Sequence, residues 1–173
     1  MSVIATPGAL GSRTPMKELN VIGSMQLLSA WQVAPRLEHL IVKSTTTIYG
    51  SSSRDPAMFT EDMSAQRQPT AGYAKDAVEV ESYVRGFARR RPDVRVTLLR
   101  AAIVVGHGGI SWELTRQLVK NLPAMVVPKW VGTRTQPISI DDVVRYLAGV
   151  VDHPDAIGRV FEIGGPDQLT YKE

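Results

Sequence analysis

Residues 39–50 read HLIVKSTTTIYG, a short apolar run followed at once by four hydroxyl side chains. Such a run is typical of a strand buried in a parallel sheet. Residues 94–100, VRVTLLR, indicate a second strand, which we expect to continue through residues 101–106. Between the two, residues 72–91 carry apolar side chains at helical spacing and end before Pro92. This part of the chain therefore predicts a strand–helix–strand unit.

Outside this unit the chain keeps alternating between helical patterns and short apolar runs. We expect a loop at residues 1–14, and strands at residues 125–128, 137–140 and 159–163. We expect helices at residues 15–32, 111–122 and 141–153, with Thr14, Ser111 and Asp141 as N-caps. Alternation of this kind indicates an α/β domain with a doubly wound, mostly parallel sheet and right-handed crossovers.

Composition excludes several classes of protein. The chain has no cysteine and its three histidines lie far apart, so we expect no metal site. No apolar run is long enough to span a bilayer and no signal-peptide pattern opens the chain, so we expect a cytoplasmic protein without membrane contact. The net charge is +3, but the only dense basic cluster, residues 89–91, ends a helix, where cations complement the dipole. We expect no nucleic-acid partner.

Three features in order resemble one family. The run at residues 44–50 follows a strand, Tyr73 opens the next helix, and residues 99–106 close the following strand. This order resembles the extended short-chain dehydrogenase/reductase family, which includes NAD-dependent sugar-nucleotide epimerases and dehydratases. The resemblance implies that Thr45 orients the substrate oxygen and that Tyr73 is the general acid/base. It also implies NAD or NADP as cofactor, contacted by Tyr73, Ala101, Ala102 and Ile103.

The resemblance also implies a domain plan. Residues 1–14 are a loop or frayed start, and residues 15–110 are the C-terminal part of a Rossmann-like NAD(P)-binding domain. Residues 111–173 form a mixed α/β portion with a small substrate-side lobe. Residues 16–100 look most like the epimerase/dehydratase branch, whereas residues 101–173 look more like atypical NAD(P)H-binding members. A glycine-rich phosphate loop is not found at the front, and residues 170–173 read as a helix start. Both ends are therefore expected to be truncated.

Two positions depart from the family pattern. The lysine that follows the tyrosine by four residues is replaced by Ala77, so the cation that lowers the pKa of the phenol is missing. Lys75 cannot replace it, because two residues along a helix is about 200° around its axis. Ile103 stands where sugar-nucleotide enzymes commonly carry a substrate-binding asparagine, so a sugar nucleotide becomes a less favoured substrate.

Two interpretations therefore stay open. In the first, the chain is an NAD(P)-dependent epimerase/dehydratase-like protein acting on a hydroxyl or ketone, impaired or inactive in isolation. In the second, it is a non-catalytic remnant or interaction module, in which residues 44–47 cap a sheet edge and Tyr73 is simply packed. An incomplete sheet exposes an apolar edge, so either interpretation predicts a homo-oligomer or a complementing polypeptide as partner.

Overall fold

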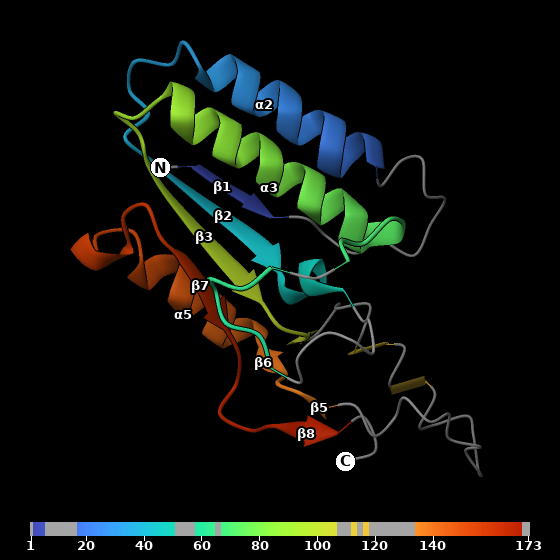
Figure 1. The fold of residues 1–173 in the computed structure, drawn as a ribbon. Coiled ribbons are helices and arrows are strands. Elements are labelled where there is room, and N and C mark those ends of the chain that lie inside the picture. The colour runs from blue at the N-terminus through green and yellow to red at the C-terminus, as the bar shows by residue number, and fades with distance from the viewer. Residues whose placement is uncertain are drawn as a thin grey trace.

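A computed structural model describes residues 2–5, 17–50, 58–64, 67–106, 112–113, 116–117 and 134–170. Its main sheet has four parallel strands in the order β1-β2-β3-β7 (Figure 1). The strands are β1 (Ser2–Ala5), β2 (His39–Thr45), β3 (Arg95–Ala101) and β7 (Val160–Ile163). The predicted α/β class and the mostly parallel sheet are confirmed.

Helices cover both faces of this sheet. On one face lie the π-helix η1 (Glu18–Ile22), α2 (Gly23–Trp31) and α3 (Gly72–Arg90), and α5 (Ile140–Gly149) lies on the other (Figure 1). Successive side chains of a strand point to opposite faces, and two core clusters divide accordingly. Leu40 and Val42 of β2 pack with Val84 of α3, whereas Ile41 packs with Val143 of α5. The sheet is doubly wound, as predicted.

The connection from β3 to β7 differs in hand from the two before it. The strand order advances in one direction throughout, but α2 and α3 lie on one face and α5 on the opposite face. The expectation that all crossovers share one hand is therefore wrong here. The physical reason is that this connection is not a direct strand–helix–strand step, because it also contains β4 (Val104–Val105) and β6 (Ile138–Ser139), which pair with each other outside the main sheet.

A small C-terminal lobe completes the described fold. It contains the β4–β6 pair and an antiparallel pair, β5 (Arg134–Thr135) with β8 (Leu169–Thr170). Gly165 joins the lobe to the end of β7, where its amide donates to the Pro137 carbonyl at 3.0 Å. A Cβ at Gly165 would collide with that carbonyl oxygen. The double glycine after β7 is therefore required by close backbone packing.

Several element boundaries differ from the sequence-based expectations. Ser2–Ala5, expected as loop, form β1, because pairing with β2 outweighs the turn-forming residues that follow. The strand expected through residues 94–106 is interrupted, since the Ala102 amide donates to Ile163 while the Ile103 carbonyl accepts from Ile138 in the small sheet. The chain thus leaves the main sheet at this point.

Both expected caps in the C-terminal part were wrong. Ser139, not Asp141, caps α5, since its hydroxyl accepts from the Asp142 amide at 3.0 Å. Thr170 lies in β8 rather than at a helix start, because it pairs with Arg134. The caps predicted at Thr14 and Ser111 and the strand predicted at residues 125–128 lie outside the described residues.

Candidate functional site

Three strands of the main sheet end at a common edge. Thr45 is the last residue of β2 and lies in register with Ala101, the last residue of β3, which in turn lies in register with Ile163 of β7. Open α/β sheets bind ligands at this carboxyl edge. Thr45 also accepts the Thr47 amide at 3.3 Å and so caps the 3-10 helix η2 (Thr46–Tyr49). The structure therefore brings two of the predicted site residues, Thr45 and Ala101, side by side.

Tyr73 lies at the same end of the molecule. It is the second residue of α3, which begins beside the carboxyl end of β2 (Figure 1). Its side chain is half-buried. Ala102 and Ile103, also half-buried, follow Ala101 where the chain crosses from the main sheet to the small one. The predicted residues therefore share one edge, while their roles in catalysis and cofactor binding stay predictions.

The position expected to hold a lysine is closed. Ala77 is 4% exposed and packs in an apolar cluster with Ile48 and Tyr49 of η2. A longer side chain there would point into this cluster rather than into a ligand site. Lys75 is exposed, in agreement with its expected direction. Within the described part of α3, no cation therefore accompanies Tyr73 along its helical face.

A buried charged network lies beneath this edge. Arg100 of β3 donates twice to Glu81 of α3, at 3.1 and 3.0 Å, and both side chains are almost fully buried. Ser44 donates to the same carboxylate at 2.7 Å, and Arg85 donates to it at 3.0 Å. Arg100 also donates to the Tyr49 hydroxyl at 2.7 Å. One carboxylate thus connects β2, β3 and α3, and through Arg100 also η2.

The same network holds the segment 58–64 in place. The Tyr49 hydroxyl donates to the Thr60 carbonyl at 3.3 Å, and its ring stacks on Phe59 with centroids 4.5 Å apart. The Glu61 carboxylate accepts the Glu162 amide of β7 at 3.0 Å. That hydrogen bond lowers the pKa of Glu61, whereas burial raises the pKa of the Glu162 carboxyl. Burial likewise raises the pKa of Tyr49, so its phenol stays protonated.

Glu81 and Arg100 were not among the predicted site residues, although the sequence contains a signal for them. Glu81 follows Tyr73 by eight residues and so lies on the same helical stripe as Ala77. A charged residue on an apolar stripe indicates a buried partner. Ser44 and Arg100 are also in register on adjacent strands, which places them on one face. Tyr49 anchors the 58–64 segment through its hydroxyl and its ring.

Asn20 is another buried polar residue near this site. It is 3% exposed and lies in η1, a π-helical turn packed against α3. Its side-chain nitrogen has no hydrogen-bond partner among the described residues. Single π-helical turns occur frequently at functional sites, so Asn20 is an additional candidate residue.

A large cavity lies elsewhere. A hollow of about 1130 Å³ runs between α5 and β7, lined by Tyr146, Val150 and Phe161 among others. Neither Thr45 nor Tyr73 lines it. We place the site at the carboxyl edge because the chemistry-bearing residues gather there. Among the residues described, no group of acidic or histidine side chains is arranged to hold a metal ion, and none of the helices is long and apolar enough to cross a membrane.

Comparisons with known proteins agree with this architecture. Two curated proteins, the uncharacterized protein Rv0501 of Mycobacterium tuberculosis (strain ATCC 25618 / H37Rv) and Mb0513 of Mycobacterium bovis, are each 50% identical over 112 residues. That match covers 65% of this chain and 30% of each relative. The chain thus spans less than a third of the curated relatives it matches.

Solved structures share the fold. UDP-glucuronic acid 4-epimerase from Bacillus cereus, in complex with UDP-glucuronic acid and NAD, has a TM-score of 0.73 at 22% identity, over 98% of this chain and 53% of that one. dTDP-glucose 4,6-dehydratase from Bacillus anthracis str. Ames, in complex with NAD, has a TM-score of 0.72 at 19% identity, over 94% and 51%. The model of the NAD dependent epimerase/dehydratase family matches residues 7–164. The chain therefore belongs to the NAD-dependent epimerase/dehydratase family.

Proposed function

We propose that this chain forms the part of an NAD(P)-dependent enzyme that carries the catalytic residues. The enzyme acts on a carbon that bears a hydroxyl or keto oxygen, by oxidation, reduction or epimerisation. One observation carries the proposal: Thr45 ends β2 beside Ala101, at the edge where α3 begins with Tyr73. A ligand at this edge meets a hydroxyl donor and a phenol together. Family membership supports the same chemistry.

In this proposal the two side chains divide the work. The Thr45 hydroxyl hydrogen-bonds the reacting substrate oxygen and fixes its position. The Tyr73 phenol exchanges a proton with that oxygen, as a general acid or base. A nicotinamide cofactor supplies the hydride chemistry when bound. The short side chain of Ala102, half-buried where the chain leaves the main sheet, leaves room for a flat ring to approach the edge, so this position fits the cofactor. Ala101 is fully buried and only forms the floor of that edge.

Ala77 determines how well Tyr73 can act as a base. A phenol has an ordinary pKa near 10, and a nearby cation is what favours its ionised form. Because Ala77 packs against Ile48 and Tyr49, no cation reaches Tyr73 from that position. This observation favours a second candidate function, a non-catalytic protein that keeps the family scaffold.

Cofactor binding separates the two candidates. We expect calorimetric titration of the chain with NAD⁺, NADH, NADP⁺ and NADPH to give saturable binding of at least one of them. We expect Thr45→Ala to weaken binding of the substrate to the cofactor-bound chain and to leave the fold intact. Tyr146→Phe, on the exposed side of α5, serves as the matched control. Absence of any binding at millimolar cofactor would remove the enzymatic proposal for this chain.

A further inference from the structure

Lys43 is the one lysine of the described part of the chain that is not exposed. It is the fifth residue of β2, in register with Ala5 on β1 and with Leu99 on β3. Leu99 is completely buried. A cationic side chain therefore emerges from the middle of the sheet, flanked on one side by a core residue.

Side-chain alternation determines the face on which Lys43 lies. The next residue, Ser44, hydrogen-bonds Glu81 on α3, and the preceding Val42 packs in the α3 cluster. Lys43 therefore faces away from α3, on the same side of β2 as Thr45. Ala101, in register with Thr45, packs in the cluster on this same side. Lys43 thus shares one face with two of the residues proposed to contact ligand.

No charge among the residues that the structure describes compensates Lys43. The buried Arg100 is paired with Glu81, and the partly buried Arg91 is paired with Asp93. Lys43 makes no hydrogen bond and no ion pair in the structure as described, and burial lowers its pKa. A partly desolvated, unpaired ammonium is costly, and an anion brought by a ligand would relieve that cost.

We propose that Lys43 binds a phosphate oxyanion of the ligand at the carboxyl edge of the sheet, beside Thr45. This inference rests on the proposed function, because a nicotinamide dinucleotide carries such groups. Phosphates of nucleotides bind at this edge of open α/β sheets, and lysine binds them as a point charge. The family pattern places a lysine at the position of Ala77 on α3. In this chain Lys43 provides a positive charge on β2 instead, two residues before Thr45.

The test uses inorganic pyrophosphate and NADH as probes, titrated calorimetrically into the wild-type chain, Lys43→Met and Lys75→Met. Methionine keeps the apolar stem of the side chain, and thermal unfolding verifies that Lys43→Met is folded. We expect Lys43→Met to raise the Kd for pyrophosphate at least about tenfold, the loss typical of a charged hydrogen bond. The exposed Lys75 is the control, and its replacement leaves that Kd within about twofold.

A proton-uptake measurement distinguishes direct contact from a structural effect. An anion favours the charged ammonium, so binding of NADH, whose phosphodiester groups do not titrate in this range, takes up protons at about pH 9.5, near the ordinary lysine pKa. Titrations in two buffers of different ionisation heat reveal this uptake in the wild type and in Lys75→Met, and we expect none in Lys43→Met. Equal pyrophosphate affinity in Lys43→Met, or no pyrophosphate binding by the wild type, would overturn the assignment.

The two probes also separate this inference from the proposed function. If NADH competes with pyrophosphate and loses affinity by the same factor in Lys43→Met, the phosphate is the cofactor's and both proposals are supported. If pyrophosphate binds through Lys43 while NADH does not bind at all, the cofactor proposal fails. The oxyanion then belongs to a phosphorylated substrate, and the assignment of Lys43 stands.

Discussion

Arg100 and Glu81 meet through two hydrogen bonds, Nε to Oε1 at 3.1 Å and Nη2 to Oε2 at 3.0 Å, with side chains only 4% and 3% exposed. The pair joins β3 to α3 directly beneath the proposed site. A buried charge that loses its partner costs far more than an exposed one. The pair is therefore the point at which the site is most sensitive to substitution.

We expect Glu81→Gln to lower the free energy of unfolding by about 3–5 kcal/mol, because it leaves the Arg100 guanidinium buried without a counter-charge. Urea denaturation measures the change. Glu79→Gln is the matched control on the same helix, where only the hydrogen bond from Tyr83 is altered and the loss is expected to stay below about 1 kcal/mol. Equal effects of the two substitutions would contradict the proposed importance of the buried pair.

Restoring a lysine at position 77 is expected to destabilise the chain. Ala77 is 4% exposed and lies against Ile48 and Tyr49, so Ala77→Lys overpacks the cluster and costs about 1–3 kcal/mol. The measurement is thermal unfolding beside Lys75→Ala, an exposed position where we expect a change within about 0.5 kcal/mol. A lysine accommodated at position 77 without loss of stability would show that this part of α3 is open to the ligand site.

The dependence of stability on pH should reveal the contribution of the Glu61 carboxylate. Its pKa is lowered from the model-peptide value of 4.5, mainly because it accepts the Glu162 amide. A lowered pKa means that the carboxylate stabilises the fold above the unfolded pKa, and that this contribution is lost as pH falls through the folded value. We expect Glu61→Gln to flatten the acid limb of a plot of Tm against pH below about pH 4.5. If the acid limb of the plot is unchanged in Glu61→Gln, the hydrogen bond from the Glu162 amide to Glu61 does not stabilise the fold.

Glu162 should behave in the opposite way. Burial raises its pKa, so its carboxylate disfavours the folded state at neutral pH, and the penalty disappears as pH falls below the unfolded pKa. Glu162→Gln is therefore expected to raise Tm at pH 7 and to leave it unchanged near pH 4. A lower Tm for the variant at pH 7 would show that the carboxylate has a stabilising partner.

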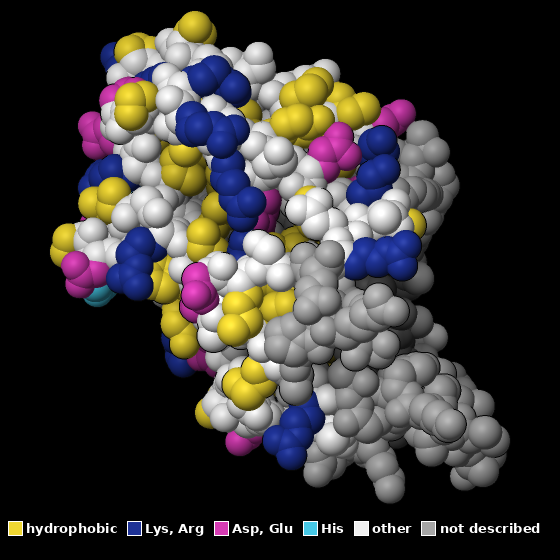
Figure 2. Space-filling model, in the orientation of Figure 1, with side chains coloured by type: hydrophobic (Ala, Val, Ile, Leu, Met, Phe, Trp, Pro, Cys, Tyr) yellow, Lys and Arg dark blue, Asp and Glu magenta, His cyan; other side chains and the backbone are white. Residues whose placement is uncertain are grey.

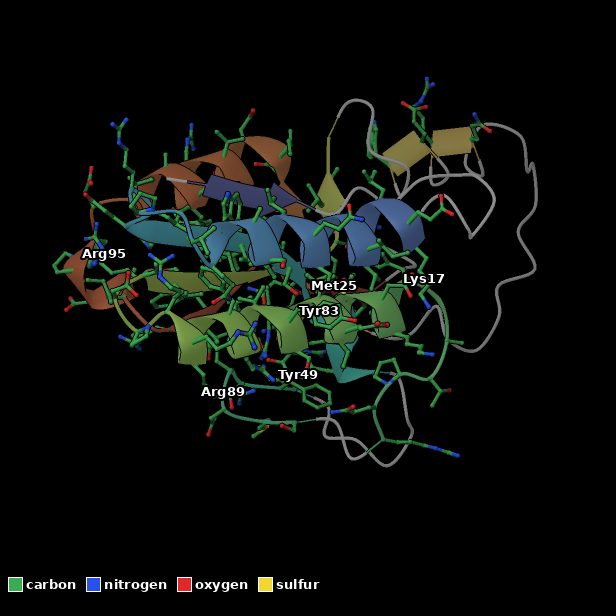
Figure 3. The ribbon with its side chains drawn as sticks, turned by 90° about the horizontal axis from the view of Figure 1, so that it is seen from above. Lys17, Met25, Tyr49, Tyr83, Arg89 and Arg95 are labelled. Carbon is green, nitrogen blue, oxygen red and sulfur yellow. The ribbon has the colours of Figure 1, made fainter. Side chains whose placement is uncertain are left out.

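The outer side of η1 and α2 is expected to mediate self-association. Leu19, Ile22 and Met25 are 64%, 40% and 43% exposed, and α2 contains no charged residue. Figure 2 shows hydrophobic side chains on the surface of this helical layer, and in Figure 3, which looks down on it, Met25 lies near Tyr83 of α3. Because the α2 part of this surface has no charge to bury, two copies can meet there, and we propose that the partner is a second copy.

Sedimentation at increasing concentration tests this partner. We expect the wild-type chain to form dimers and Met25→Glu to shift the equilibrium toward monomers. Val33→Glu is the control, at a position 84% exposed and beyond the end of α2. A wild-type chain that stays monomeric at high concentration would exclude this surface as an interface.

Elements with a strong local pattern were predictable from the sequence, whereas contacts between distant segments were not. The period of α3 and the apolar runs of β2 and β3 depend only on neighbouring residues, and all three were confirmed. β1 has only four residues, and its place depends on pairing with residues 40–43. His39 hydrogen-bonds the Val151 carbonyl, 112 residues away, a contact that no local pattern predicts.

The site was predictable to the same extent. Thr45 ends a recognisable strand, so its place at the carboxyl edge followed from strand direction alone. The end of β3 at Ala101 was not predicted, because the apolar run continues beyond it and only the hydrogen bonds of residues 102 and 103 with different strands end it. The side-chain network of Glu81 and Arg100 depends on which face of α3 meets the sheet, and that is decided by tertiary packing. Lys43 could be placed opposite α3 only after the Ser44–Glu81 hydrogen bond was known.

The hydrogen bond between Glu61 and the Glu162 amide has a consequence for growth of the sheet. β7 is a terminal strand, and a neighbouring polypeptide could add to it only through amides of this kind. The Glu162 amide is already occupied by the Glu61 carboxylate, so an incoming strand would have to displace a charged acceptor. At this amide the sheet is therefore protected against lengthening beside β7.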